Sequence, residues 1–151
     1  MLNISGPLKL TFNAAYTKQK QLGTRDAPPG FSGTIPPANL AAPEWAGTAA
    51  VDYFHPISAE SELQFHFEIF GTKKYQAQNN YVPGYSLANT SLRLTNIAGL
   101  GIDAAVWVRN VFDKYYIIAP VIVDPQQFPV KAALFGEPRT VGFELTYRFG
   151  R

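Results

Sequence analysis

The chain contains no cysteine and few charged residues, since Asp, Glu, Lys and Arg make up 16% of its 151 positions. The absence of cysteine excludes disulfides and thiolate metal sites, and it says little about the compartment. The net charge is only +2, and the Lys and Arg residues are scattered rather than clustered. A nucleic-acid-binding surface is therefore not indicated, because such surfaces concentrate positive charge.

Long apolar runs are also missing, and none reaches the roughly 18–20 residues that a membrane helix needs. The first residues provide neither a basic region nor an apolar core of the kind that a signal peptide has. An exported protein needs such a signal. If the chain is exported, we therefore expect it to be a fragment, or a truncated open reading frame, whose export signal lies upstream or has been lost.

Aromatic residues are abundant, with 11 Phe, 8 Tyr and 2 Trp, and glycine and proline occur 12 times each. Charged residues are scarcer than the roughly one quarter that is usual in soluble domains. Many aromatics, few charges and no apolar helix together suit a β-barrel in lipid, where apolar and polar residues alternate along each strand.

Six segments alternate with a period of two, which is typical of strands with one apolar face. These segments are residues 8–17, 45–54, 62–70, 85–95, 102–112 and 139–149. The fifth ends near Phe112, and the pattern leaves open whether it continues through Tyr115 and Tyr116. Lengths of about 9–11 residues are what a tilted strand needs to cross the hydrocarbon core. The sixth segment alternates without error, and its apolar face consists of Val141, Phe143, Leu145, Tyr147 and Phe149.

Long and short connections alternate between these segments. Residues 18–44, 71–84 and 117–138 form long links, and residues 55–61 and 96–101 form short ones. Outer-membrane barrels have short periplasmic turns and long extracellular loops. The first, third and fifth strands would then rise from the periplasm, and the C-terminus would lie on the periplasmic side. The fold class predicted is all-β, an antiparallel up-and-down transmembrane β-barrel segment of about six strands that forms an incomplete barrel.

Two motifs near the C-terminus carry a resemblance to a known family. Residues 109–116, RNVFDKYY, resemble the penultimate strand of TonB-dependent receptors, where N-[LV]-F-D-[KR]-x-Y recurs. Residues 136–139, GEPR, resemble the G-x-P-R opening of that family's final strand, and residues 141–149 resemble its aromatic ending. The family usually ends on the aromatic residue itself, whereas Gly150 and Arg151 follow Phe149 here.

The resemblance implies that residues 1–151 are the C-terminal part of a receptor barrel of about 22 strands, without its plug domain. Such a receptor lies in the Gram-negative outer membrane and takes up a scarce nutrient such as a siderophore, cobalamin, haem or an oligosaccharide. The partners implied are outer-membrane lipid, the remainder of the barrel and the plug, TonB through the missing N-terminal part, and the barrel-assembly machinery. That machinery reads the final aromatic strand.

Aromatic residues in the long links are the candidate ligand-binding residues, because aromatic rings can stack on a ligand or cover it. They are Phe31, Tyr75, Tyr81, Tyr85 and Phe128. The alternative is that they pack the loops together or join an aromatic girdle at the membrane surface. His66 and Glu68 share one strand face and are interpreted as lumen-facing polar residues rather than metal ligands. No catalytic set can be assembled, so we expect neither an enzyme nor a cofactor.

Asn110 and Asp113 are interpreted as residues that satisfy a locally kinked backbone, with Phe112 packed inside the barrel or at its wall. Two other classes of protein stay open. A small pore or adhesion barrel would pair its first and last strands, and a soluble ligand-binding module would bury one face of each strand in a closed core. On the receptor interpretation, the isolated chain should aggregate or form an open sheet with exposed edges.

Overall fold

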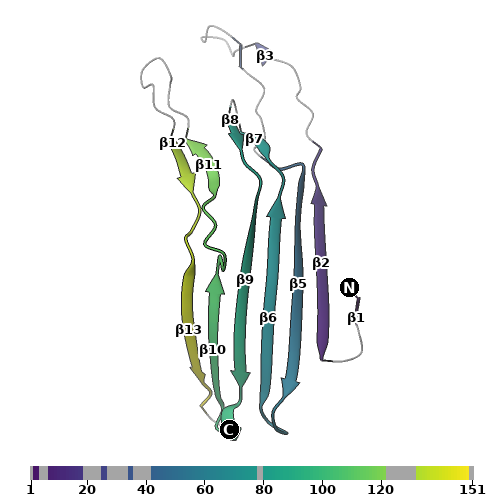
Figure 1. Ribbon diagram of the computed structural model, residues 1–151, viewed down its shortest axis with the longest axis vertical. Coiled ribbons are helices and arrows are strands. Elements are labelled where there is room, and N and C mark those ends of the chain that lie inside the picture. The colour runs from purple at the N-terminus through teal and green to yellow at the C-terminus, as the bar shows by residue number, and fades with distance from the viewer. Residues whose placement is uncertain are drawn as a thin grey trace.

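The computed structural model describes residues 2–3, 7–18, 25–26, 34–35, 42–77, 80–121 and 132–149. It contains one antiparallel sheet of six long strands with a short β1 (Leu2–Asn3) at one edge (Figure 1), so the predicted all-β fold class is confirmed. The long strands, in their order across the sheet, are β2 (Leu8–Tyr16), β5 (Trp45–Pro56), β6 (Glu62–Thr72), β9 (Tyr85–Thr95), β10 (Ile102–Arg109) and β13 (Thr140–Tyr147).

The register of the ladders aligns the apolar positions of all six long strands on one side of the sheet. A continuous row crosses the sheet through direct partners, namely Leu8, Tyr53, Phe65, Leu92, Val106 and Phe143. A slip of one residue in any pair would turn that strand's apolar side chains to the opposite side. We call the side that carries this row the apolar face.

The opposite side is the polar face. The row next to the one above crosses it through Lys9, Asp52, His66, Ser91, Trp107 and Gly142. The two rows differ by one residue in every strand, as the sequence alternation predicts. Five of the six strands place a polar side chain or a glycine in this row, and Trp107 is the exception.

The apolar face is not covered by a second layer. Within the described ranges, the buried hydrophobic side chains are those of Ala50, Val82, Ala88 and Ala105, and three of these four are alanines. Large side chains of the apolar face are exposed, and Phe143 reaches 82%. Soluble monomeric proteins rarely expose large contiguous apolar surfaces. The closed core expected for a soluble module is absent from the described residues.

The sheet does not close on itself. Among the described residues, β13 pairs with β10 and with no other strand, and the other edge is formed by β1 and β2. The expected open sheet with exposed edges is therefore present. A small self-contained barrel would pair its first and last strands, and no such pairing is present among the described residues. The described residues include no helix long and apolar enough to cross a membrane.

The short connections lie together at one end of the sheet and the long ones at the other (Figure 1). The short turn between β9 and β10 contains a single 3-10 turn, η1 (Ile97–Gly99). The sequence pattern predicts the long links only as connections, whereas in the structure each of them contains a short hairpin. These pairs are β3 (Arg25–Asp26) with β4 (Thr34–Ile35), β7 (Tyr75–Ala77) with β8 (Asn80–Val82), and β11 (Ile117–Val121) with β12 (Ala132–Phe135).

The predicted ends of the last two long strands were wrong. β10 stops at Arg109 instead of Phe112, because Asn110 and Asp113 both adopt the left-handed conformation with φ of 50°. Asn and Asp tolerate this region better than other residues with a Cβ, so the interpretation of a kinked backbone is confirmed. Phe112 is 69% exposed, so its ring is not buried against the described residues. β13 begins at Thr140, one residue later than predicted, and ends at Tyr147, two residues earlier than predicted.

Candidate functional site

The polar face contains a hollow of about 330 Å³ near the β6, β9, β10 and β13 strands. Its charged residues are Glu68, Arg93, Arg109 and Glu144. The other residues that line it are His66, Asn89, Thr90, Ser91, Ala105, Trp107 and Val108. Both His66 and Glu68, interpreted from the sequence as lumen-facing polar residues, thus lie on the polar face and border the same hollow.

Four side chains of the hollow form two pairs across the sheet. Asn89 donates from Nδ2 to Oε1 of Glu68 over 2.8 Å. Nη2 of Arg93 lies 3.3 Å from Oε1 of Glu144, so these two charges form an ion pair across β9 and β13. Both pairs join strands that are neighbours or next neighbours in the sheet, which keeps the charged groups aligned above the backbone.

Arg109 and Trp107 form a stack at the side of the hollow. The guanidinium carbon of Arg109 lies 5.0 Å from the centre of the Trp107 ring, within the range of a cation–π contact. Beneath the ring lies Gly142, the direct partner of Trp107 on β13, and a Cβ at this glycine would overlap the indole. The glycine therefore gives the indole a place to lie over the neighbouring strand. Large aromatic side chains stabilise strand glycines in this way.

A second polar group lies toward the β2 side of the same face. Nδ1 of His66 is 2.6 Å from Oδ1 of Asp52, and Nζ of Lys9 is 3.6 Å from Oδ2 of the same carboxylate. The carboxylate thus contacts two basic side chains on its neighbouring strands. The described part of the chain contains no cluster of three or more His, Cys, Asp or Glu side chains that could hold a metal ion.

The loop aromatics predicted from the sequence do not all come together. Tyr85 lies 4.6 Å, centre to centre, from Tyr116 and 6.2 Å from Phe70. Tyr75 donates from its hydroxyl to the carbonyl oxygen of Ile118 over 2.9 Å and so connects the β7–β8 and β11–β12 hairpins. Two of the five candidates therefore act within the packing at the bases of the outer hairpins.

The remaining three candidates have different positions. Tyr81 on β8 is 70% exposed and remains accessible to a ligand. Phe31 and Phe128 lie outside the described residues. The sequence reasoning missed Tyr116, whose ring lies over Gly136. Tyr116 precedes β11 and Gly136 follows β12, and the two meet at the base of this hairpin through the bond from the Gly136 N–H to the Tyr116 carbonyl. The available signal was an aromatic residue and a glycine at the two ends of one long link, and only the pairing within the link shows that they meet.

Trp107 and Arg109 were not selected from the sequence as site residues. The alternation of 102–109 assigned both to the polar side of their strand, and that assignment is correct. The available signal for a site was the presence of an indole and a guanidinium on a face of otherwise small and polar residues. Their contact could not be predicted, because Trp107 and Arg109 are two residues apart on the same strand and meet only in particular side-chain conformations.

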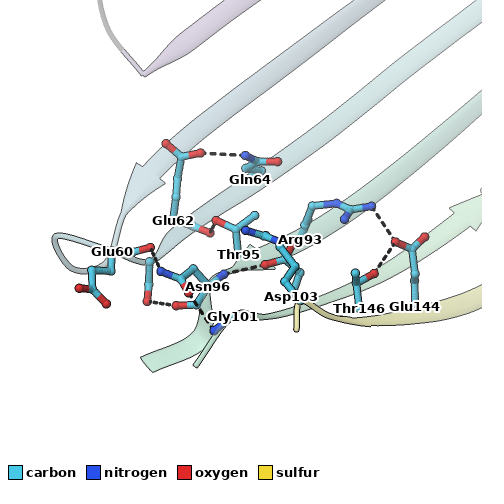
Figure 2. A network of polar contacts seen from close by, with 12 residues as sticks. Glu60, Glu62, Gln64, Arg93, Thr95, Asn96, Gly101, Asp103, Glu144 and Thr146 are labelled. Carbon is cyan, nitrogen blue, oxygen red and sulfur yellow. Dashed lines mark hydrogen bonds and ion pairs between the residues drawn. The ribbon is translucent and has the colours of Figure 1, made fainter. Parts of the chain in front are cut away.

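The end of the sheet with the short turns is fixed by a buried polar network (Figure 2). Asp103 accepts from the backbone N–H of Asn96 over 2.8 Å and pairs with Arg148 of the C-terminal segment. Asn96 donates from Nδ2 to the carbonyl of Glu60 and accepts at Oδ1 from the N–H of Gly101. Both short turns and the end of β13 are thus tied to Asn96 and Asp103.

The predicted assembly-signal strand forms the free edge of the sheet. Its apolar residues Val141, Phe143, Leu145, Tyr147 and Phe149 are all exposed. Tyr147 and Phe149 meet edge to face with their ring centres 4.5 Å apart. Tyr147 is the direct partner of Ile102, the first residue of β10 after the short turn, so the two rings lie at the end of the sheet with the short turns. Comparison with known proteins finds no matching family, no similar curated protein and no similar solved structure.

Proposed function

We propose that this chain is a wall segment of a TonB-dependent receptor in the Gram-negative outer membrane, which takes up a scarce nutrient such as a siderophore. The C-terminus lies on the periplasmic side, and the hairpins β3–β4, β7–β8 and β11–β12 lie outside the cell. Because the sheet is open, the proposal requires further strands and a plug from the rest of the receptor to complete the barrel.

The observation that carries the proposal is the uncovered apolar face. Six neighbouring strands place their apolar residues on it in register, and these residues do not meet a second layer in the described part of the chain. The polar face carries ion pairs and a hollow instead. This division suits a wall with lipid on one side and water on the other.

Two further observations support the orientation and the family. The connections separate into short turns at one end and hairpin-bearing links at the other, as in outer-membrane barrels. The NVFD segment, by which the chain resembles the family, forms a defined turn at the base of the last outer hairpin. Asn110 and Asp113 take the left-handed conformation within this turn.

The proposal is tested by placing one reactive group at a time on each face, which the cysteine-free sequence allows. Phe67→Cys and His66→Cys are adjacent on β6 but lie on opposite faces. Each variant of the full chain is labelled with a fluorophore and refolded with phosphatidylcholine vesicles, in which the open edges of neighbouring copies can pair. Lipids with a quencher on the acyl chain should quench the label at position 67, and aqueous iodide should quench the label at position 66.

A matched pair on the next strand repeats the measurement, with Leu92→Cys on the apolar face and Ser91→Cys on the polar face. Quenching from the same phase at both positions of both pairs would contradict a lipid-facing wall. Orientation is read in a Gram-negative host that exports the chain. A membrane-impermeant maleimide should label Tyr81→Cys on intact cells, and Ser58→Cys in the short turn only after permeabilisation.

A further inference from the structure

We propose that the hollow on the polar face binds a small anion bearing a carboxylate or phosphate group, received by the guanidinium of Arg109. The inference rests on the proposed function in one respect, namely that the polar face is reached by water and by a transported ligand. It adds to that function the charge of the ligand and the residue that receives it.

The hollow is lined by two acidic and two basic side chains, and Arg109 is the basic one that forms no ion pair with a described residue. Glu68 accepts from Asn89, and the carboxylate of Glu144 is engaged by Arg93. Arg109 has no ion pair or hydrogen bond from its guanidinium to any described residue. An anion entering the hollow would therefore find one guanidinium whose donors are not already used by a carboxylate.

The stack on Trp107 holds that guanidinium in place without using its donors. The guanidinium carbon of Arg109 lies over the Trp107 ring, and a contact of this kind uses none of the N–H donors with which a guanidinium binds carboxylate or phosphate through two parallel hydrogen bonds. Gly142 under the indole fixes the ring in turn. The ordering of a long side chain is thus achieved before the anion arrives, which reduces the entropy lost on binding.

The hollow has the size and the additional polar groups for a small ligand. Its volume of about 330 Å³ is at the lower end of the range for small-molecule sites. The Ser91 hydroxyl lines it beside the charged residues and can donate to a second oxygen of the anion. Glu68 and Glu144 border the same space and would repel an anion that approached away from Arg109.

The two tryptophans of the chain allow a direct measurement. In the variant Trp45→Phe, Trp107 is the sole tryptophan and lies against Arg109. The full chain carrying this substitution is folded into phosphatidylcholine vesicles and titrated with malonate, inorganic phosphate and choline. Malonate and phosphate should change the Trp107 emission saturably, and choline should not. The added substitution Arg109→Gln should lower the affinity for both anions by about tenfold or more.

Arg109→Lys keeps the charge but loses the planar fork, so it should bind the anions with an affinity between those of the parent and the glutamine variant. Arg139→Gln is the matched control, because Arg139 lies near Asp113 outside the hollow, and its loss should leave binding unchanged. Equal affinities in the parent and in Arg109→Gln would overturn the proposal. A parent that gives no saturable response to either anion would overturn it too.

An acidic side chain of another protein segment could supply the same chemistry, so a hexaglutamate peptide forms a further arm. Saturable binding of the peptide without binding of malonate or phosphate would also overturn the proposal of a small-anion site. The quenching measurement on Phe67→Cys and His66→Cys is independent of Arg109. If position 67 faces lipid and no anion binds, the proposed anion site is contradicted and the proposed membrane wall stands. If an anion binds and position 67 does not face lipid, the membrane wall is contradicted and the anion site stands.

Discussion

The side-chain amide of Asn110 donates to the carbonyl of Glu137 over 3.1 Å, across 27 positions of the chain. The same Nδ2 donates to the carbonyl of Lys114, and Oδ1 accepts from the Lys114 N–H. One amide therefore joins the end of β10 to both sides of the β11–β12 hairpin base. The left-handed backbone of Asn110 is what directs the side chain into this position.

Replacing Asn110 by alanine should destabilise the chain by about 2–4 kcal/mol, because it removes three hydrogen bonds and places a Cβ-bearing residue without a polar side chain at positive φ. Urea unfolding in phosphatidylcholine vesicles, followed by tryptophan emission, measures the change. Asn110→Gly keeps the backbone conformation and should recover the part of the loss that is due to strain. Equal losses for alanine and glycine would show that strain contributes nothing.

The alternation of the sequence was sufficient to predict the six long strands and the face that each residue occupies. The period of two is a property of the strand itself, and pairing in register keeps it across the sheet. The bounds of β9 agree with the prediction, and those of β5 and β6 extend two residues further. These extensions continue beyond the apolar pattern, where backbone pairing alone defines the strand.

The features that the sequence did not predict all depend on two segments meeting. Trp107 and Gly142 become partners only through the register of β10 with β13, and the outer hairpins depend on pairings within the long links. The end of β10 at Arg109 required recognition that Asn110 takes a positive φ. Of the candidate site, the faces of His66 and Glu68 were predictable, and the stack of Arg109 on Trp107 was not.

Gly142→Val should displace the Trp107 indole and destabilise the sheet by about 1–3 kcal/mol, since a Cβ at this position overlaps the ring. The emission of Trp107 in the Trp45→Phe background should move toward that of a solvent-exposed indole. Gly71→Ala is the control, because a Cβ there meets its nearest neighbour, Cβ of Ser86, at 3.9 Å, an ordinary contact. A Gly142 variant no less stable than the Gly71 variant would argue that the indole has other positions of equal energy.

The pair of Asp103 and Arg148 should couple the C-terminal segment to the short turns. Asp103 is only 7% exposed and also accepts from the backbone N–H of Asn96, so Arg148→Met leaves its carboxylate without this cation and should lower the free energy of unfolding. Asp103→Asn in the same chain removes the unpaired charge and should recover part of that loss. The double-mutant cycle in urea unfolding gives the coupling, and a coupling near zero would mean that the pair does not fix this end of β13.

The stability of arginine variants on β2 should show whether the apolar face contacts water or lipid. Phe12 on the apolar face is 68% exposed, so in water Phe12→Arg should cost little. In a bilayer the same change near the middle of the strand should cost about 2–4 kcal/mol, because the charge lies in hydrocarbon. Asn13→Arg, one residue along on the polar face, should cost little in either setting. Unfolding measured in phosphatidylcholine vesicles should therefore separate the two variants. Equal stability of both in vesicles would remove the physical basis for lipid contact at this face, whatever the exposure of its side chains.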